Sequence, residues 1–253
     1  MCDTCGCNIT HGNAHLIEPG GPLEKTDSGR EAVGVLENLL HENNHLAQHN
    51  REHFDRHHTL AINLMSAPGS GKTALLEKTI AALKDEFSIA VIEGDLETEN
   101  DAERIRRQGV EAIQISTGSA CHLDAHMVHD ALHHMKLDSV DLLFIENVGN
   151  LVCPASFDLG QHYNITLLSV PEGDDKPAKY PVMFRKSDVV MISKADLLPV
   201  LDDFQPDRAR EYLHDLASDA PVFEVSSKTG QGMELWLDWI RNQNRLANVR
   251  QTG

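Results

Sequence analysis

The stretch of sequence that decides the fold is Ser66-Ala67-Pro68-Gly69-Ser70-Gly71-Lys72-Thr73. An apolar run over residues 60–65 precedes it, and a segment of helical character that begins at Ala74 follows it. A strand, a glycine-rich loop that ends in Gly-Lys-Thr, and a helix form the arrangement of a phosphate-binding loop, or P-loop. The sequence therefore predicts a nucleotide site here, and this context disfavours an accidental glycine-rich turn.

The residue types of the loop indicate how phosphates would be held. Gly69 and Gly71 let backbone N–H groups close around phosphate oxygens, and the dipole of the following helix favours their charge. We expect Lys72 to reach the β- and γ-phosphates and the Thr73 hydroxyl to bind Mg²⁺. Ser66 stands where the first glycine of the motif is usual. The predicted nucleotide contacts of this loop are Gly69, Ser70, Gly71, Lys72, Thr73 and Ala74.

Two later apolar runs end in carboxylates. The first ends in Ile92-Glu93-Gly94-Asp95, and the second ends at Glu146, three residues before Gly149. The carboxyl ends of parallel strands meet at one edge of a sheet, so both carboxylates can face the phosphates. We predict Thr73, Asp95 and Glu146 as magnesium ligands, and Lys72, Asp95 and Glu146 as catalytic residues. A helix cap is the alternative role for a lone carboxylate after a strand.

The segment Ser193-Lys194-Ala195-Asp196 resembles the guanine-specificity element Asn-Lys-x-Asp. A carboxylate at Asp196 accepts hydrogen bonds from groups of guanine that adenine lacks, so the segment predicts GTP as the substrate. Lys194 would lie along the base. Ser193 replaces the Asn that often ties this loop to the P-loop, which favours modest affinity. Further predicted base contacts follow a later apolar run at Ser226, Ser227 and Lys228.

The whole chain divides into three segments. Residues 1–30 are rich in Cys, Gly and Pro and predict a flexible Cys-rich metal-binding head and linker. Residues 31–58 predict a His-rich amphipathic helix, and residues 59–253 a GTPase domain. The apolar runs of that domain alternate with amphipathic segments, which predicts an α/β P-loop NTPase fold with a mostly parallel sheet flanked by helices. The runs cover residues 60–65, 89–92, 112–115, 142–145, 165–170, 189–192 and 222–225.

Composition narrows the class of protein. The formal net charge of −17 over 253 residues disfavours a broad surface for nucleic acid and favours attraction of cations. No apolar run approaches the roughly 18 to 20 residues that span a bilayer, and the first residues do not resemble a secretory signal. We therefore expect a cytoplasmic protein with neither nucleic acid nor membrane as a partner.

Three thiols crowd the start of the chain, at Cys2, Cys5 and Cys7. Clustered cysteines in a reducing compartment favour metal ligation over disulfides. Tetrahedral Zn²⁺ usually needs a fourth Cys or His, whereas thiolates beside a terminal amine favour a planar Ni²⁺ site. We therefore predict nickel ahead of zinc at this head. A redox-active pair of thiols and an incidental cluster are the competing interpretations.

The chain resembles the HypB family of GTPases, which help to insert nickel into [NiFe]-hydrogenases. The resemblance covers nearly the whole chain and is carried by the thiol head, the P-loop, Gly94-Asp95 and the segments 121–125, 145–154, 171–177 and 193–196. It implies a dimer-forming GTPase of the SIMIBI class with slow hydrolysis. It also implies a homodimer linked to nucleotide or metal, an accessory protein that relays nickel, and the hydrogenase large subunit as partners.

The resemblance implies a second metal site made by Cys121, His122 and Cys153. The positions support it, because Cys121-His122 begins a predicted helix and Cys153 lies four residues beyond Gly149, in the segment that senses nucleotide. Metal occupancy would then depend on the nucleotide state. The alternative is that both cysteines are small buried apolar residues.

Histidines recur at every fourth position of the predicted N-terminal helix, at His41, His45, His49, His53 and His57. Pairs of neighbours could chelate metal, but the stripe winds around the helix and cannot form one five-ligand site. A solvated polar face is favoured over metal storage, and the helix could instead contact a partner protein. A similar spacing is present at His122, His126, His129 and His133.

Two other functions stay open. One is a nickel or zinc storage protein with a regulatory nucleotide site, which the short histidine stripe favours weakly. The other is a related GTPase that serves urease or a cobalamin enzyme, which the thiol head disfavours.

Overall fold

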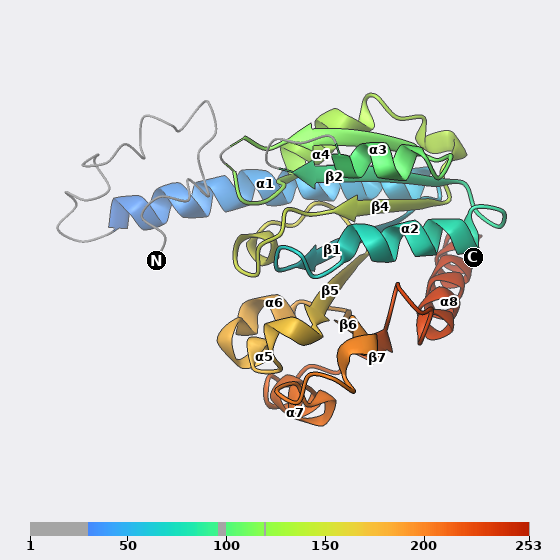
Figure 1. Cartoon of the computed structure of the whole chain (residues 1–253). Coiled ribbons are helices and arrows are strands. Elements are labelled where there is room, and N and C mark those ends of the chain that lie inside the picture. Colours follow the sequence, from blue (N-terminus) through green and yellow to red (C-terminus); the bar gives the residue numbers. More distant parts are fainter. Residues whose placement is uncertain (1–29, 96–99, 119, 253) are drawn as a thin grey trace.

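The computed structural model describes residues 30–95, 100–118 and 120–252 (Figure 1). In this part of the chain seven strands form one parallel sheet, in the order β3-β2-β4-β1-β5-β6-β7. The strands are β1 Leu60–Ser66, β2 Ile89–Asp95, β3 Glu111–Ser116, β4 Leu142–Glu146, β5 Tyr163–Ser169, β6 Val189–Ser193 and β7 Val222–Val225. All seven apolar runs of the sequence are strands, and the predicted parallel α/β fold is confirmed.

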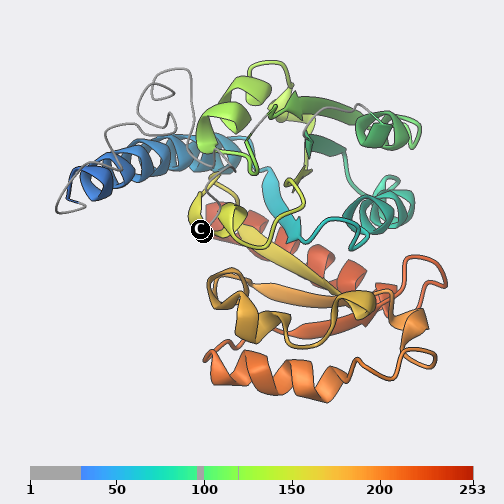
Figure 2. The same cartoon turned by 60° about the vertical axis from the view of Figure 1, so that its left-hand side comes forward.

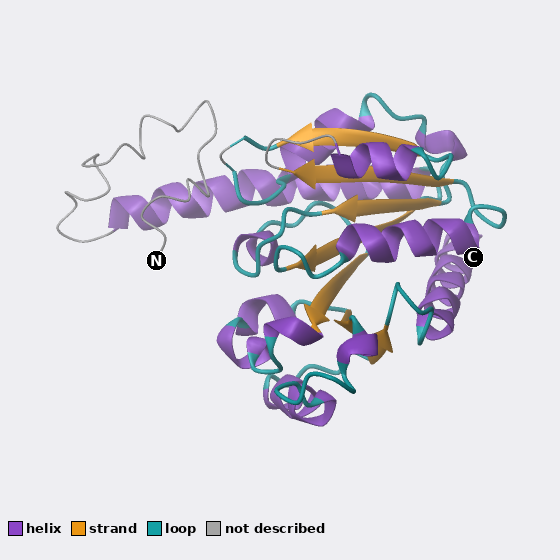
Figure 3. Cartoon of the chain, viewed as in Figure 1, coloured by secondary structure: helices purple, strands orange, loops and turns teal. Residues whose placement is uncertain are grey.

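Helices cover both faces of the sheet (Figures 1 and 3). Alternate residues of the buried strand β1 divide between the faces, so Leu60, Ile62 and Leu64 pack with one set of helices and Ala61 with another. The first face carries α2 Lys72–Leu83, α3 Asn100–Arg106 and α8 Met233–Thr252. The second face carries α1 Arg30–Arg56, α4 Ala125–Leu132, α6 Pro181–Arg185 and α7 Pro206–Asp215. One short helix, α5 Lys176–Lys179, contacts α6 and α7.

The N-terminal helix α1 is joined to the sheet by its C-terminal half. Phe54 is fully buried in the core beneath the second face, and Asn50 is buried against α4. The other end of α1 projects past the sheet (Figures 1 and 2). The expected His-rich helix is therefore present and contributes to the core, while the head with Cys2, Cys5 and Cys7 lies outside the described residues.

Among the described residues, no helix combines the length and the apolar character required to cross a bilayer.

Candidate nucleotide and metal site

The P-loop joins β1 to α2 at the carboxyl ends of the strands. Gly69 and Gly71 have φ values of 73° and 97°, which L side chains adopt only with strain. The loop forms one wall of a cavity of about 400 Å³, which Lys72, Thr73, Asp95 and Glu146 also line. Predicted phosphate, magnesium and catalytic residues therefore face a single cavity.

Ser66, the departure from the usual P-loop motif, holds the lysine of the loop. The Nζ atom of the buried Lys72 donates to Ser66 Oγ at 3.0 Å, and Ser70 Oγ also donates to Ser66 Oγ. A serine at this position accordingly supplies an acceptor that glycine could not, and it keeps the ammonium group beside the cavity.

Two buried carboxyl groups meet under the P-loop. Thr73 Oγ1 donates to Glu146 Oε1 at 2.8 Å, while Glu146 Oε2 is buried without a hydrogen-bond partner. Glu93 is opposite Glu146 in the register of β2 and β4, and its Oε1 atom is likewise buried without one. Burial and the neighbouring Glu146 raise the pKa of Glu93 to about 10. Burial also raises the pKa of Glu146, against the opposing charge of Lys72.

This set of oxygens fits a magnesium ion. Divalent magnesium prefers hard oxygen ligands and is held by few protein groups plus phosphate and water. The Thr73 hydroxyl and the carboxyl groups of Glu146 and Glu93 supply such oxygens, and a cation would stabilise the ionised form of both glutamates, which burial and proximity disfavour. Asp95, the residue expected from the sequence, lies at the end of the same strand and lines the same cavity.

The proposed base-reading loop is tied to the P-loop. Ser193 Oγ donates to the backbone oxygen of Ser70 at 2.8 Å, and Lys194 Nζ donates to that of Gly69 at 2.7 Å. The tie to the P-loop that an Asn often makes in GTPases is therefore made in this chain by Ser193. Asp196 Oδ1 accepts from the buried Ser226 Oγ at 2.6 Å, which fixes the carboxylate.

The backbone N–H of Ser226, which the sequence suggested as a base contact, is already hydrogen-bonded. It donates to Gln231 O at 2.9 Å, inside its own loop. Of the three residues expected to meet the base, Ser227 and Lys228 are the remaining backbone candidates, because they extend further toward solvent.

Cys121, His122 and Cys153 form a compact cluster. One ligand atom from each lies within 4.8 Å of the other two. His122 is buried and stacks on Phe157 with ring centroids 4.0 Å apart. Burial lowers the pKa of His122 to about 4, so its imidazole is neutral and can bind metal. Burial and Cys153 raise the pKa of Cys121 to about 12, so forming the thiolate without a cation is unfavourable. A bound cation would stabilise that thiolate.

The segment after β4 contacts both the P-loop and this cluster. Asn147 follows Glu146, and its Oδ1 atom accepts from the N–H groups of Leu123 and Val148 at 3.1 and 3.0 Å. Asn150 Nδ2 donates to Cys121 O at 3.3 Å. A Cβ atom on Gly149 would lie 2.8 Å from Pro68 Cα, so only glycine lets this segment approach the P-loop so closely.

Comparison with known proteins identifies the family. Residues 60–224 match the model of the CobW/HypB/UreG nucleotide-binding domain. The chain belongs to the CobW/HypB/UreG family. It is 46% identical over 233 residues to "Hydrogenase maturation factor HypB" of Escherichia coli K12, covering 92% of this chain and 78% of that one. Hence the HypB resemblance seen in the sequence is confirmed.

A second relative within the family carries a broader name. "Hydrogenase/urease maturation factor HypB" of Helicobacter pylori is 44% identical over 220 residues, 85% of this chain and 90% of that one. The crystal structure of HypB from Helicobacter pylori in complex with nickel superposes with a TM-score of 0.77 at 46% identity, covering 81% of this chain and 95% of that one.

The sequence of the present chain did not predict two of the polar residues at its candidate nucleotide site. Glu93 lies two positions before Asp95, and Asn147 directly follows Glu146. The available signal for Glu93 was a charged residue within an otherwise apolar strand, because such a residue is rarely fully buried without a role. No sequence pattern indicated that Asn147 would accept a hydrogen bond from Leu123, which lies 24 residues before it.

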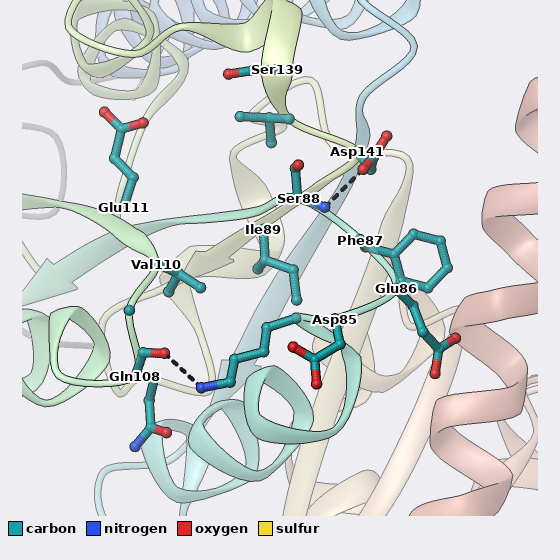
Figure 4. Close-up of a pocket in the computed structure, with 13 residues that line it drawn as sticks. Asp85, Glu86, Phe87, Ser88, Ile89, Gln108, Val110, Glu111, Ser139 and Asp141 are labelled. Atoms are coloured by element: carbon teal, nitrogen blue, oxygen red, sulfur yellow. Dashed lines mark hydrogen bonds between the residues drawn. The ribbon is translucent and has the colours of Figure 1, made fainter.

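A second hollow, of about 580 Å³, lies at the opposite edge of the sheet and carries no such arrangement (Figure 4). It lies before β2, β3 and β4, at their amino ends, whereas parallel sheets bind ligands at the carboxyl ends. Two of its polar groups bond within it: Lys84 Nζ donates to Gln108 O at 3.1 Å, and Ser88 N donates to Asp141 Oδ2 at 2.7 Å. The larger volume of this hollow therefore does not identify it as the nucleotide site.

Proposed function

We propose that this chain is a GTP-hydrolysing metallochaperone that supports the insertion of nickel into a [NiFe]-hydrogenase. The names of its HypB relatives and the nickel complex of the Helicobacter pylori relative support the metal and the target. The soft and borderline ligands Cys121, His122 and Cys153 suit nickel, and they suit zinc as the alternative metal.

The nucleotide half of the function uses the cavity under the P-loop. Backbone N–H groups of residues 69–74 hold the phosphates, and Lys72 neutralises charge on the β- and γ-phosphates. Magnesium, when bound, supplies further positive charge at those oxygens, with Thr73, Glu146 and Glu93 or Asp95 around it. Asp95 also orients the attacking water, and Asp196 selects guanine over adenine. Slow turnover is expected, because none of these groups is a strong general base.

The observation that supports the proposal is the chain of hydrogen bonds and sequence neighbours from the P-loop to Cys121, His122 and Cys153. Thr73 bonds to Glu146, the adjacent Asn147 bonds to Leu123, and Leu123 follows His122 directly. On the other side, Asn150 bonds to Cys121 and Cys153 lies three residues further on. A γ-phosphate that moves this segment must therefore change the distances between the three metal ligands. By linkage, metal must change nucleotide affinity by the same factor.

Nickel affinity in two nucleotide states tests the proposal. The protein would carry Cys2, Cys5 and Cys7 replaced by Ala, so that only other sites report. We expect at least a tenfold difference in nickel affinity, about 1.4 kcal/mol, between GDP and a non-hydrolysable GTP analogue. The same measurement on Asn150→Ala, which removes one bond to Cys121, should reduce the difference. Equal affinities in both states would reduce the cluster to a structural site.

Partners follow from the incomplete ligand set. Three protein ligands leave a position of a four-coordinate ion for a further donor. Val152, beside Cys153, is 58% exposed and places an apolar side chain next to the opening. We propose that a second copy of the chain closes the site in a nucleotide-linked homodimer, and that a nickel-relay protein and the hydrogenase large subunit receive the ion. Sedimentation with GTP analogue and nickel, together and singly, tests the dimer.

A target other than hydrogenase has one observation in its favour. The Helicobacter pylori relative is named as a maturation factor of hydrogenase and urease. Capture of partners from the native cell by the tagged full chain discriminates, since recovery of urease components without hydrogenase components would favour the second target.

A further inference from the structure

A cluster of histidines joins two helices on the second face of the sheet, away from the P-loop. His49 and His53 come from α1, and His129 and His133 come from the end of α4. The ring of His129 lies 5.1 Å from that of His49, 6.3 Å from that of His53 and 4.6 Å from that of His133, between centroids. The expected solvated stripe is thus only part of the arrangement, because His53 is half-buried against α4.

The tautomer of His129 is fixed by its neighbour. The Nδ2 group of the buried Asn50 donates to Ala125 O at 2.9 Å and to Leu159 O at 3.1 Å, so its Oδ1 atom is turned toward His129. That oxygen can only accept, and it lies 3.1 Å from His129 Nδ1. Nδ1 therefore carries the proton, and the lone pair of His129 is on Nε2. Metal-binding imidazoles are commonly oriented by such a bond on the opposite nitrogen.

The lone pair of His129 faces a second imidazole at the spacing that one ion requires. The Nε2 atoms of His129 and His133 lie 3.1 Å apart. With metal–nitrogen bonds of roughly 2.0 to 2.1 Å, two imidazoles on a tetrahedral ion place their nitrogens roughly 3 Å apart. An ion between them would replace one shared hydrogen bond by two metal–nitrogen bonds.

The surroundings of His53 and His129 disfavour their protonation. Burial, His49 and other nearby positive groups lower the pKa of His53, and burial, His133 and His49 lower the pKa of His129. Neutral imidazole, the ligand form, is thereby favoured at neutral pH.

We propose that His129 and His133, completed by His49 or His53, bind a divalent transition-metal ion that fastens α1 to the body of the protein. Imidazole nitrogen suits nickel, zinc and cobalt ions. His49 and His133 are exposed and can rotate toward the ion, while His129 is held by Asn50. The site has no thiolate, and it shares no residue with the Cys121, His122 and Cys153 cluster. It consequently stands whether or not that cluster carries nickel.

Metal binding by the full chain without its thiol ligands tests the proposal. The parent variant has all five cysteines replaced by Ala, and equilibrium dialysis with Ni²⁺ measures the bound ion. We expect about one ion per chain, whose binding is weakened at least tenfold by His133→Ala and by the double substitution His49→Ala with His53→Ala. His134→Ala is the matched control, since His134 is an exposed histidine beside His133, and it should leave the affinity unchanged. Circular dichroism confirms that each variant is folded.

Two further measurements distinguish a metal ion that links α1 to α4 from an ion held by two histidines of α4 alone. Co²⁺ bound to the parent should give ligand-field absorption without thiolate charge-transfer bands. Saturating Ni²⁺ should raise the melting temperature of the parent and of His134→Ala, but not that of His133→Ala. Loss of binding in His133→Ala with full binding in the double variant His49→Ala, His53→Ala would overturn the proposal, because the ion would then belong to α4 alone. Equal binding in all variants would overturn it too.

Discussion

At the scale of single residues, the sequence motifs located the site but not the bonds within it. The positions of Ser66 and Ser193 were recognised as departures from common GTPase usage, yet their partners were not predictable. Ser66 accepts from Lys72 and Ser193 donates to the backbone of Ser70, from a strand 123 residues away. Such bonds depend on side-chain geometry at the sheet edge, which no local pattern encodes.

Asp196→Asn should exchange the base preference. The Asp196 carboxylate is fixed by Ser226, so it is oriented for the N1–H and 2-amino groups of guanine. Asn would instead donate to the 2-oxo group of xanthine, and one buried mismatch costs roughly 1 to 3 kcal/mol. We expect GTP affinity to fall about tenfold to a hundredfold and xanthosine triphosphate affinity to rise. Competition binding measures both, and an unchanged preference for GTP would show that this loop does not read the base.

Glu93→Gln should separate stability from catalysis. In metal-free protein, folding places Glu93 beside Glu146 in a buried site, which requires proton uptake or two adjacent charges. Gln requires neither, so denaturant unfolding should show a gain on the order of 1 kcal/mol. The Mg²⁺ concentration for half-maximal GTP hydrolysis should rise at least tenfold. Glu172→Gln is the control, because Glu172 is half-buried and also has a side-chain oxygen without a hydrogen bond. An unaltered Mg²⁺ dependence would exclude Glu93 from the cation site.

At the scale of elements, apolar runs predicted the strands well and the packing of helices poorly. The runs that form the central strands are apolar enough to require burial on both faces, and the edge strands β3 and β7 are only partly buried. The contact of α1 with α4 had no such signal, because it rests on Asn43 and Asn50, polar residues that bond to the backbone of Ala125 and Leu159. Polar residues on a helix face indicate solvent unless their partners are known.

The link between α1 and the sheet should weaken in mild acid. His162 Nδ1 accepts from Ala61 N at 3.0 Å, and its Nε2 lies 3.0 Å from Asp55 of α1. Burial lowers the pKa of His162 in the folded state, despite Asp55. The unfolded chain therefore binds the proton more readily, so stability rises with pH up to the unfolded value of 6.5 and falls as pH decreases below it.

Denaturant unfolding between pH 5 and 8 measures this effect. We expect His162→Gln, which cannot titrate, to lose less unfolding free energy between about pH 6.5 and 5 than the unsubstituted protein. His214→Gln, on α7, should behave like the unsubstituted protein. Parallel pH profiles for the unsubstituted protein and His162→Gln would mean that His162 takes up its proton equally in the folded and unfolded states.

At the scale of the whole molecule, the chain combines one nucleotide-binding domain with three groups of candidate metal ligands on separate parts of the chain. The Cys121, His122 and Cys153 cluster lies beside the segment that follows β4, and the proposed coupling to nucleotide depends on this contact. The histidine cluster lies between α1 and α4. Cys2, Cys5 and Cys7 precede the described residues, about 55 positions before the P-loop and beyond Pro19-Gly20-Gly21-Pro22. Their spacing predicted a metal site from sequence alone, since clustered thiols need no fold to be recognised.

Replacement of Cys2, Cys5 and Cys7 by Ala should remove the tightest nickel binding and leave GTP hydrolysis intact. Thiolates within six residues can enclose one ion without help from the GTPase domain. The Pro-Gly stretch and the length of chain that follow make a mechanical effect on the P-loop small. Competition of nickel against a chelator should show at least a hundredfold loss of affinity, while the rate of GTP hydrolysis stays within about twofold. Cys121→Ala with Cys153→Ala is the reciprocal control, which should retain the tight site. Full-affinity nickel binding by the triple variant would transfer the tight site to the GTPase domain, and a loss of hydrolysis would show that the head contacts it.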